Sequence, residues 1–194
     1  MVTDEVYEHL TFDDHEHVPL ATLPGMFDRT LAISSSGKTF SFTGWKVGWA
    51  TGPADLVAAV EGAKNWLSFS SGAPLQPAIA HALDHEGAFH ERLRDDLTHR
   101  RDFLCEGLDA LGLEVHVPQG TYFVTTDVST LGYADGKAFC TALAARARVV
   151  AIPTQAFYED DSAHGRHLIR WAFCKEQDVL AEGIRRLQAA DLRA

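Results

Sequence analysis

Cysteine is scarce in this 194-residue sequence, which contains three, at positions 105, 140 and 174. A scattered set with an odd count is not a disulfide framework, and all three cysteines have apolar or helical surroundings. We therefore expect reduced, mostly buried thiols, as is typical of a cytoplasmic protein.

Positive charge is also in short supply. The sequence has 17 Lys and Arg against 27 Asp and Glu, a net charge of −10 at pH 7. This balance argues against nucleic acid and anionic membrane surfaces as partners, because both attract basic proteins. No apolar run is long enough to cross a bilayer, and no signal peptide opens the sequence. His9, His15 and His17 lie close together, but no further ligand pattern accompanies them, so we expect no metal site.

The most informative stretch runs from Thr30 to Trp49 and reads TLAISSSGKTFSFTGWKVGW. An apolar, β-prone run leads into a turn of small polar residues that ends at Lys38. Small neighbours allow a bulky or planar group to come close to the lysine amine. Lys46 follows in a segment rich in glycine and aromatic residues. Two lysines on a tight, glycine-containing surface indicate an anionic ligand, with one amine available for chemistry.

Two alternatives compete at Lys38. The first is an ordinary solvated lysine in a loop, which leaves the surrounding tryptophans and serines unexplained. The second is a nucleotide-binding P-loop, since Gly37, Lys38 and Thr39 match that motif while Ala32 replaces its first glycine. A P-loop needs a helix that begins at the lysine. Residues 40–45 read FSFTGW, which is not a helical pattern, so this alternative is remote.

The segment from Ser34 to Trp49 has the form S-S-x-G-K-T-F-x-x-T-G-W-K-x-G-W. It resembles the lysine motif of the class I/II aminotransferases of fold type I, in which a lysine forms a Schiff base with pyridoxal 5'-phosphate. Within that family it is most similar to the branch of kynurenine–glutamine transaminases and N-succinyldiaminopimelate aminotransferases. The resemblance covers nearly all of the sequence.

The resemblance implies a role for each matching residue. Lys38 is the expected catalytic residue and carries the cofactor. Asp4 would keep the pyridine nitrogen protonated, and Tyr7 would place its hydroxyl near the phenolic oxygen of the ring. Ser35 and Lys46 would hold the phosphate through a hydroxyl and a point charge. Without the motif, Asp4 would read as a strand-end cap and Tyr7 as a packed aromatic.

Arg170 is the remaining candidate. It lies in the apolar run LIRWAF, and a charge there must be satisfied because its burial is costly. A structural ion pair is one solution. The match to the family's I-R-x-x-F element implies the other, a bidentate contact to the α-carboxylate of the substrate.

The pattern predicts an α/β protein, the C-terminal part of the fold of pyridoxal-phosphate-dependent transferases. We expect a remnant of the large domain in residues 1–86, a linking helix in 87–112 and a small α/β domain in 113–194. Strands are expected at residues 28–33, 47–51, 114–117, 122–127, 149–152 (buried) and 167–173. Helices are expected at 55–66, 78–85, 88–111, 137–148 and 177–192.

In the family, a stretch like Asp4–Leu10 lies deep in the large domain, so we expect the sequence to be a C-terminal fragment. The implied function is transfer of an amino group between an amino acid and a 2-oxo acid by a homodimer. Three alternatives stay open: a C–S β-lyase, a catalytically silent dimerisation module, and the P-loop nucleotide binder.

Overall fold

The computed structural model describes residues 1–70, 72–159 and 163–194. They form two compact units, Met1–Arg94 and Asp95–Ala194. The division lies inside helix α4 (Gly87–Asp109), within the range expected for a linking helix. The assignment of the flanking residues to a large-domain remnant and a small domain stays a prediction.

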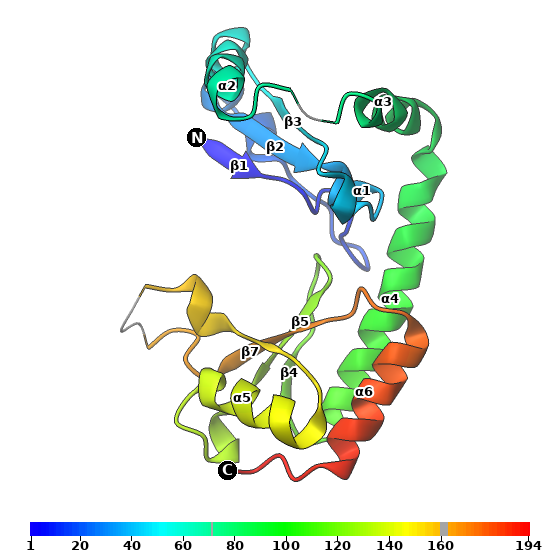
Figure 1. The fold of residues 1–194 in the computed structure, drawn as a ribbon, viewed down its shortest axis with the longest axis vertical. Helices are drawn as coiled ribbons and strands as arrows, with labels where there is room; N and C mark the ends of the chain where they lie inside the picture. Colours follow the sequence, from blue (N-terminus) through cyan, green and yellow to red (C-terminus); the bar gives the residue numbers. More distant parts are fainter. Residues whose placement is uncertain (71, 160–162) are drawn as a thin grey trace. The chain divides into compact units, whose positions relative to one another are not determined.

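The first unit contains a three-stranded sheet in the order β1-β2-β3 (Figure 1). Strand β1 (Val2–Asp4) pairs in parallel with β2 (Leu31–Ser35), and β3 (Gly48–Thr51) pairs antiparallel with β2. Strand β2 begins later than expected because residues 27–29 form a turn of 3-10 helix. The expected strand at 47–51 is confirmed with a one-residue difference.

Two glycines allow β3 to approach β2. A Cβ atom at Gly48 would lie 2.8 Å from the carbonyl oxygen of Ser34, and one at Gly52 would lie 2.7 Å from that of Thr30. Real Cβ atoms do not approach backbone oxygen this closely, so a side chain at either position would push the strands apart. Sheet pairing next to the lysine turn therefore depends on both glycines.

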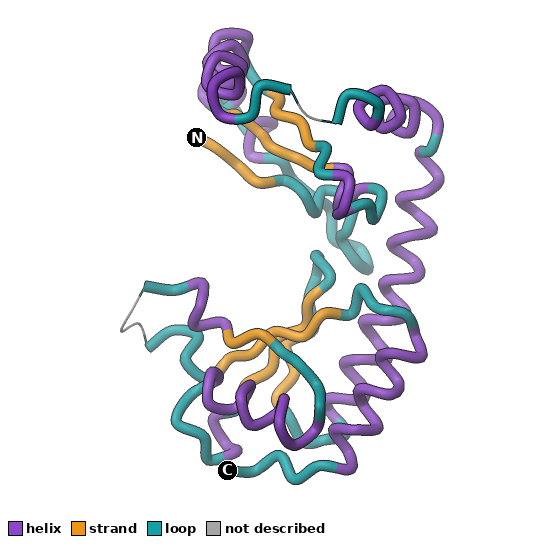
Figure 2. The backbone as a smooth tube through the Cα atoms, in the orientation of Figure 1, coloured by secondary structure: helices purple, strands orange, loops and turns teal. Residues whose placement is uncertain are grey.

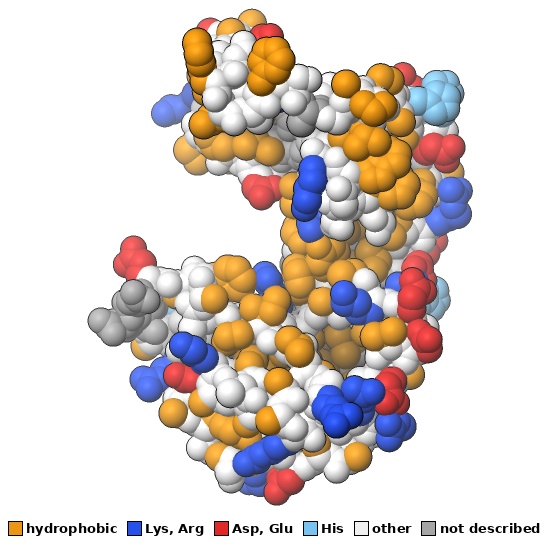
Figure 3. Space-filling model, viewed as in Figure 1, with side chains coloured by type: hydrophobic (Ala, Val, Ile, Leu, Met, Phe, Trp, Pro, Cys, Tyr) orange, Lys and Arg blue, Asp and Glu red, His pale blue; other side chains and the backbone are white. Residues whose placement is uncertain are grey.

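Helices of the first unit follow the sheet. Helix α1 (Ser36–Thr39) is a single turn, α2 (Ala54–Leu67) has no buried residue, and α3 (Leu75–His85) buries Ile79. Hydrophobic side chains reach the surface over α2 and α3 (Figure 3). The core of this unit combines apolar residues with buried polar ones near the lysine turn: Leu10, Phe12, Leu31, Phe40, Ile79, Thr30, Ser34, Ser36 and Thr39.

The second unit contains a sheet in the order β4-β5-β7-β6, with antiparallel pairing throughout. Figure 2 shows its strands in orange. Its strands are β4 (Glu114–His116), β5 (Phe123–Asp127), β6 (Ile152–Pro153) and β7 (Leu168–Ala172). Its own helices are α5 (Gly136–Ala147) and α6 (Gln177–Ala189). Short 3-10 helices complete the chain at Leu20–Thr22, Phe27–Arg29, Thr43–Trp45, Ser129–Leu131 and Thr154–Phe157.

Strands β5 and β7 alternate between a buried and a half-exposed face, as the pleat requires. Val124, Ile169 and Trp171 are buried on one face, whereas Phe123 and Arg170 are half-exposed on the other. The Trp171 indole donates a hydrogen bond to the hydroxyl of Thr126, 2.9 Å away, so its polar atom is satisfied inside the core. The strands expected at 122–127 and 167–173 are therefore confirmed.

The expected buried strand at 149–152 is wrong. Only Ile152 and Pro153 pair with β7, and the Val150 side chain is 80% exposed. An apolar run of four residues predicts a buried strand only when another element covers it. Here β6 is the edge of the sheet, and Arg148 ends α5 in the left-handed conformation just before the run.

The cysteines differ from one another more than expected. All three are free thiols, but Cys105 is buried, Cys140 is half-buried and Cys174 is exposed. Burial raises the pKa of Cys105 and of Cys140 to about 11, which keeps both protonated at neutral pH. None of the helices in the described residues combines the length and apolarity that a membrane span requires.

Candidate active site

The lysine turn is built by the end of β2 and the single turn of α1. The Ser35 hydroxyl caps this turn by accepting a hydrogen bond from the Gly37 amide, 3.1 Å away. The amide and the hydroxyl of Ser36 both donate to the carbonyl oxygen of Val47, at 3.1 and 2.8 Å. These contacts fix the backbone on both sides of Lys38, whose side chain is half-buried.

A side chain at the glycine inside the turn would be crowded. A Cβ atom at Gly37 would lie 3.2 Å from the Ser35 hydroxyl and 3.2 Å from Cα of Thr43. A side chain there would crowd the hydroxyl that caps α1. The small residues before Lys38 therefore have two effects. They let the turn close around the Ser35 hydroxyl, and they leave room beside the lysine amine.

Tyr7 and Asp4 belong to the same edge of the sheet as Lys38. Because β1 and β2 run in parallel, their carboxyl ends lie together, and Asp4 closes β1 opposite Ile33 of β2. The Nζ atom of Lys38 lies 5.9 Å from the centroid of the Tyr7 ring. The Asp4 carboxylate is exposed and accepts a hydrogen bond from the Val6 amide, 3.2 Å away.

Lys46 reaches the same edge from β3. It has a left-handed backbone (φ 56°) and lies two residues before Gly48, which pairs with Ser35. The Lys46 side chain is exposed and lines a hollow of about 330 Å³ in the first unit, together with Lys64 and residues of α3. Ser35 ends β2 and Lys46 lies just before β3, so a hydroxyl and an ammonium group come from neighbouring segments, a donor set suited to a phosphate dianion.

The structure weakens the P-loop alternative. Helix α1 begins at Ser36 and ends at Thr39, and the chain leaves the helical conformation at Phe40. One turn of four residues supplies little of the macrodipole and few of the free amides that bind nucleotide phosphates.

Arg170 lies in the middle of β7, paired with Thr125 of β5 and Ile152 of β6. Its guanidinium carbon is 3.9 Å from the centroid of the Phe123 ring and 4.4 Å from that of Phe157. Among the described residues, no carboxylate forms an ion pair with Arg170. Within the described residues, a structural ion pair therefore does not satisfy the charge of Arg170.

A histidine pair contacts the lysine turn, and no local sequence pattern indicates this contact. The rings of His9 and His90 stack at 4.0 Å between centroids, and Nδ1 of His90 lies 3.2 Å from the carbonyl oxygen of Thr39. The centroid of the Phe40 ring lies 5.2 Å from that of the His90 ring. Burial, and secondarily the nearby His90, lower the pKa of His9. Since 81 positions separate the two histidines, only the folded chain brings them together.

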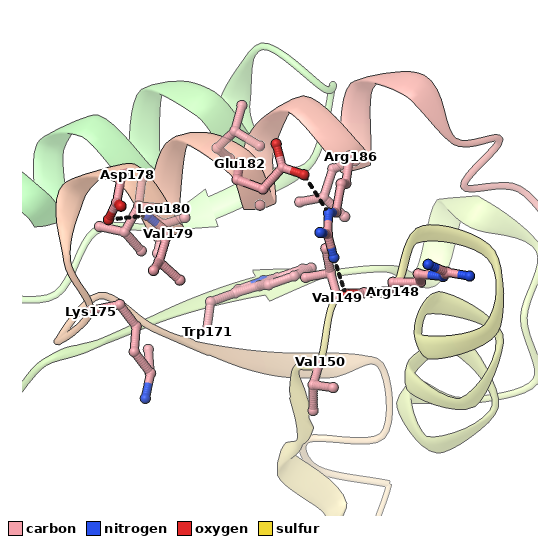
Figure 4. Close-up of a pocket in the computed structure, with 15 residues that line it drawn as sticks. Arg148, Val149, Val150, Trp171, Lys175, Asp178, Val179, Leu180, Glu182 and Arg186 are labelled. Carbon is pink, nitrogen blue, oxygen red and sulfur yellow. Dashed lines mark hydrogen bonds and ion pairs between the residues drawn. The ribbon is translucent and has the colours of Figure 1, made fainter.

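A second cavity, of about 520 Å³, lies in the second unit beside α6 (Figure 4). Trp171, Val150 and Val179 are among the residues that line it. Arg170, the expected site residue of this unit, does not line it, because Trp171 and Arg170 point to opposite faces of β7.

Comparison with known proteins identifies the family. The family model "Aminotransferase class I and II" matches residues 1–187. The chain is 50% identical to the probable N-succinyldiaminopimelate aminotransferase DapC of Mycobacterium tuberculosis, over 96% of this chain and 49% of that protein. It is 37% identical to the kynurenine–oxoglutarate transaminase of Dictyostelium discoideum, over 93% of this chain and 46% of that protein.

Solved structures agree with the sequence comparison. The structure of N-succinyldiaminopimelate aminotransferase from M. tuberculosis matches with a TM-score of 0.93 and 51% identity, over 97% of this chain and 49% of that one. The chain thus spans about half the length of the relatives it matches, and the expected fold class is confirmed. Since the family model extends over nearly the whole sequence, the chain belongs to the class I and II aminotransferases.

Proposed function

We propose that the whole protein is a pyridoxal-phosphate-dependent aminotransferase in which Lys38 forms the covalent link to the cofactor. The observation that carries this proposal is the convergence of Lys38, Tyr7 and Asp4 at one edge of the first unit's sheet. The amine, the carboxylate, the hydroxyl of Ser35 and the ammonium group of Lys46 suit the aldehyde, pyridinium and phosphate of that cofactor. When bound, the cofactor supplies an electron sink for the pair released from the Cα–H bond of the substrate.

Lys38 has the central task. Once the incoming amino acid has displaced it from the link to the cofactor, its amine would take the proton from the substrate Cα as general base and return it as general acid. The Asp4 carboxylate would keep the ring nitrogen protonated, and the Tyr7 hydroxyl would donate a hydrogen bond to the phenolic oxygen of the ring. Small residues before Lys38 leave room for this exchange.

The remaining residues bind and orient. Ser35 and Lys46 hold the phosphate, and Arg170 binds the α-carboxylate of the substrate so that the Cα–H bond is correctly aligned. The substrates are an amino acid and a 2-oxo acid, and the working form is a cytoplasmic homodimer. Relatives named for N-succinyldiaminopimelate, kynurenine and methionine give the amino donors to test first.

Reductive trapping tests the proposal. The protein is incubated with pyridoxal phosphate and reduced with borohydride, and the pyridoxyl group is located by peptide mass spectrometry. We expect the label on Lys38 and its loss in Lys38→Ala. Lys64, which donates to the carbonyl oxygen of Phe69 at 2.7 Å, is the matched lysine in the same unit, and Lys64→Ala should label normally.

The outcomes separate the alternatives. Failure of Lys38 to label contradicts the proposal and favours the silent dimerisation module. Protection of the lysine turn by a nucleoside triphosphate would favour the P-loop. If Lys38 labels and a cysteine conjugate yields pyruvate and a thiol faster than glutamate forms from 2-oxoglutarate, the β-lyase is the main activity.

A further inference from the structure

Arg170 is held by two aromatic rings from different parts of the second unit. Phe123 belongs to β5, where it pairs with Ala172, so it is the diagonal neighbour of Arg170 on the same face of the sheet. Phe157 is the last residue of the 3-10 helix Thr154–Phe157, which follows the edge strand β6. Both ring faces lie within 4.4 Å of the guanidinium carbon.

The rings limit how the guanidinium can move. Among the described residues Phe123 and Phe157 have no ring contact with each other, which indicates that they approach the guanidinium from different sides. The Nε atom of Arg170 is buried and has no hydrogen-bond acceptor among the described residues. With its faces and its Nε enclosed, the group can meet a ligand only through its outer nitrogens, in the guanidinium plane.

We propose that Phe123 and Phe157 are positioning residues, which hold the Arg170 guanidinium in the orientation that receives the substrate carboxylate. This inference rests on the proposed role of Arg170. Aromatic faces attract the delocalised cation without using any of its hydrogen-bond donors, so the outer pair stays available for a bidentate contact. A guanidinium fixed before binding also loses less rotational freedom when the carboxylate arrives.

Phe157 is the better position for a test because its side chain is 59% exposed, so its loss disturbs the core little. Phe157→Leu removes the ring face, and Phe157→Tyr restores it. Phe27 is the matched control, since it is 58% exposed and belongs to the first unit. Phe27→Leu makes the same chemical change in a unit that does not contain Arg170.

The first measurement needs neither cofactor nor activity. Arginine-labelled protein gives an NMR signal for Arg170 Nε–H, assigned by its loss in Arg170→Gln. We expect slow rotation about the Nε–Cζ bond and slow solvent exchange in the parent protein, in Phe157→Tyr and in Phe27→Leu. Both rates should rise in Phe157→Leu. Equal rates in Phe157→Leu and the parent protein would overturn the inference.

The second measurement is kinetic and uses the active holoenzyme. Phe157→Leu should raise KM for the amino acid about three- to tenfold with a smaller change in kcat, whereas Phe157→Tyr and Phe27→Leu should stay near the parent value. In an Arg170→Gln background Phe157→Leu should have no further effect. A full additional effect there would show that Phe157 acts independently of Arg170 and would refute a positioning role. If Arg170→Gln itself leaves KM unchanged, the proposed carboxylate role fails, while the NMR rates still decide whether the rings hold the guanidinium.

Discussion

The lysine turn depends on residues that do no chemistry themselves. His90 lies against the carbonyl oxygen of Thr39, and His9 stacks on His90, so two titratable rings lie under the backbone that carries Lys38. Glu8 and His17 also influence His9, the first raising its pKa and the second lowering it. Protonating the stack would place positive charges in contact in a partly buried site.

The lowered pKa of His9 predicts an acid-sensitive fold. Because the folded pKa lies below the unfolded value of about 6.5, the unfolded chain binds the proton more readily. The stability contributed by neutral His9 is therefore complete above that value and is lost as pH falls from about 6.5 toward the folded pKa. His9→Phe keeps a ring on His90 and removes this titration, so its urea midpoint should fall less between pH 7 and pH 5.5.

His15→Phe is the control for that experiment, because His15 is exposed and does not belong to the stack of His9 on His90. The urea midpoint of His15→Phe should fall between pH 7 and pH 5.5 by as much as that of the parent protein. A His9→Phe variant that loses stability as steeply as the parent would show that His9 is not responsible.

Site residues differed in how far they could be predicted. The spacing of Asp4, Tyr7 and Lys38 matched a family motif, and the structure brings them to one sheet edge because parallel strands end together. Their chemical roles stay predictions until the trapping experiment is done. The histidine stack and the aromatic contacts of Arg170 could not be predicted, because nothing in the local sequence marks which distant rings will meet.

Elements with strong periodicity were predicted well, and the short edge strand was not. Helix α5 lies close to the range expected at 137–148, and it buries Phe139, Leu143 and Ala147 at helical spacing. The prediction of a buried strand at 149–152 was wrong because hydrophobicity alone does not tell whether a neighbouring element covers a strand. Helix pairing adds a further constraint that periodicity does not reveal.

Contact between α4 and α6 predicts opposite effects for two glycines. A Cβ atom at Gly107 of α4 would lie 2.6 Å from Cδ1 of Ile184, which is buried on α6, whereas one at Gly183 would meet nothing within 4 Å. Gly107→Ala should lower the free energy of unfolding by about 1–2 kcal/mol through overpacking. Gly183→Ala should raise it by up to about 1 kcal/mol, since alanine favours a helix interior.

Urea denaturation measures both changes in the free energy of unfolding. Trp171 fluorescence reports the unfolding of the second unit. Ile184→Val removes the nearest atom and should return part of the stability lost in Gly107→Ala. If both alanine variants shift the free energy of unfolding in the same direction, the close approach of the helices at Gly107 does not determine the effect of Gly107→Ala.

At the scale of the whole molecule, the two units differ in how completely they bury their apolar residues. Most of the fully buried large side chains belong to the second unit, among them Phe139, Phe173, Leu108, Ile169, Leu187, Val124 and Val128. In the first unit, helix α2 and the residues after it expose Trp66 (93%), Leu67 (86%) and Phe69 (76%). Apolar groups gathered in this way are typical of a surface that another protein surface covers.

This exposure predicts that Trp66 and Leu67 contribute to association and not to folding. The double variant Trp66→Ser, Leu67→Gln should leave the free energy of unfolding within about 0.5 kcal/mol of the parent value. It should also lower self-association, measured by sedimentation over a range of protein concentrations. A loss of stability well above that margin would mean that these side chains are packed within the unit, and unchanged sedimentation would remove them from any interface.

The sequence by itself determined the features that depend on neighbouring residues. Small residues before Lys38 form a tight turn, alternation sets the faces of β5 and β7, and the lysine motif indicates the family, because each of these patterns is read over a few consecutive positions. Only the tertiary structure decided that His9 stacks on His90, that Phe123 and Phe157 enclose Arg170, and that Val150 stays exposed. Those contacts join residues far apart in the chain, and their geometry is fixed when the sheets and helices pack.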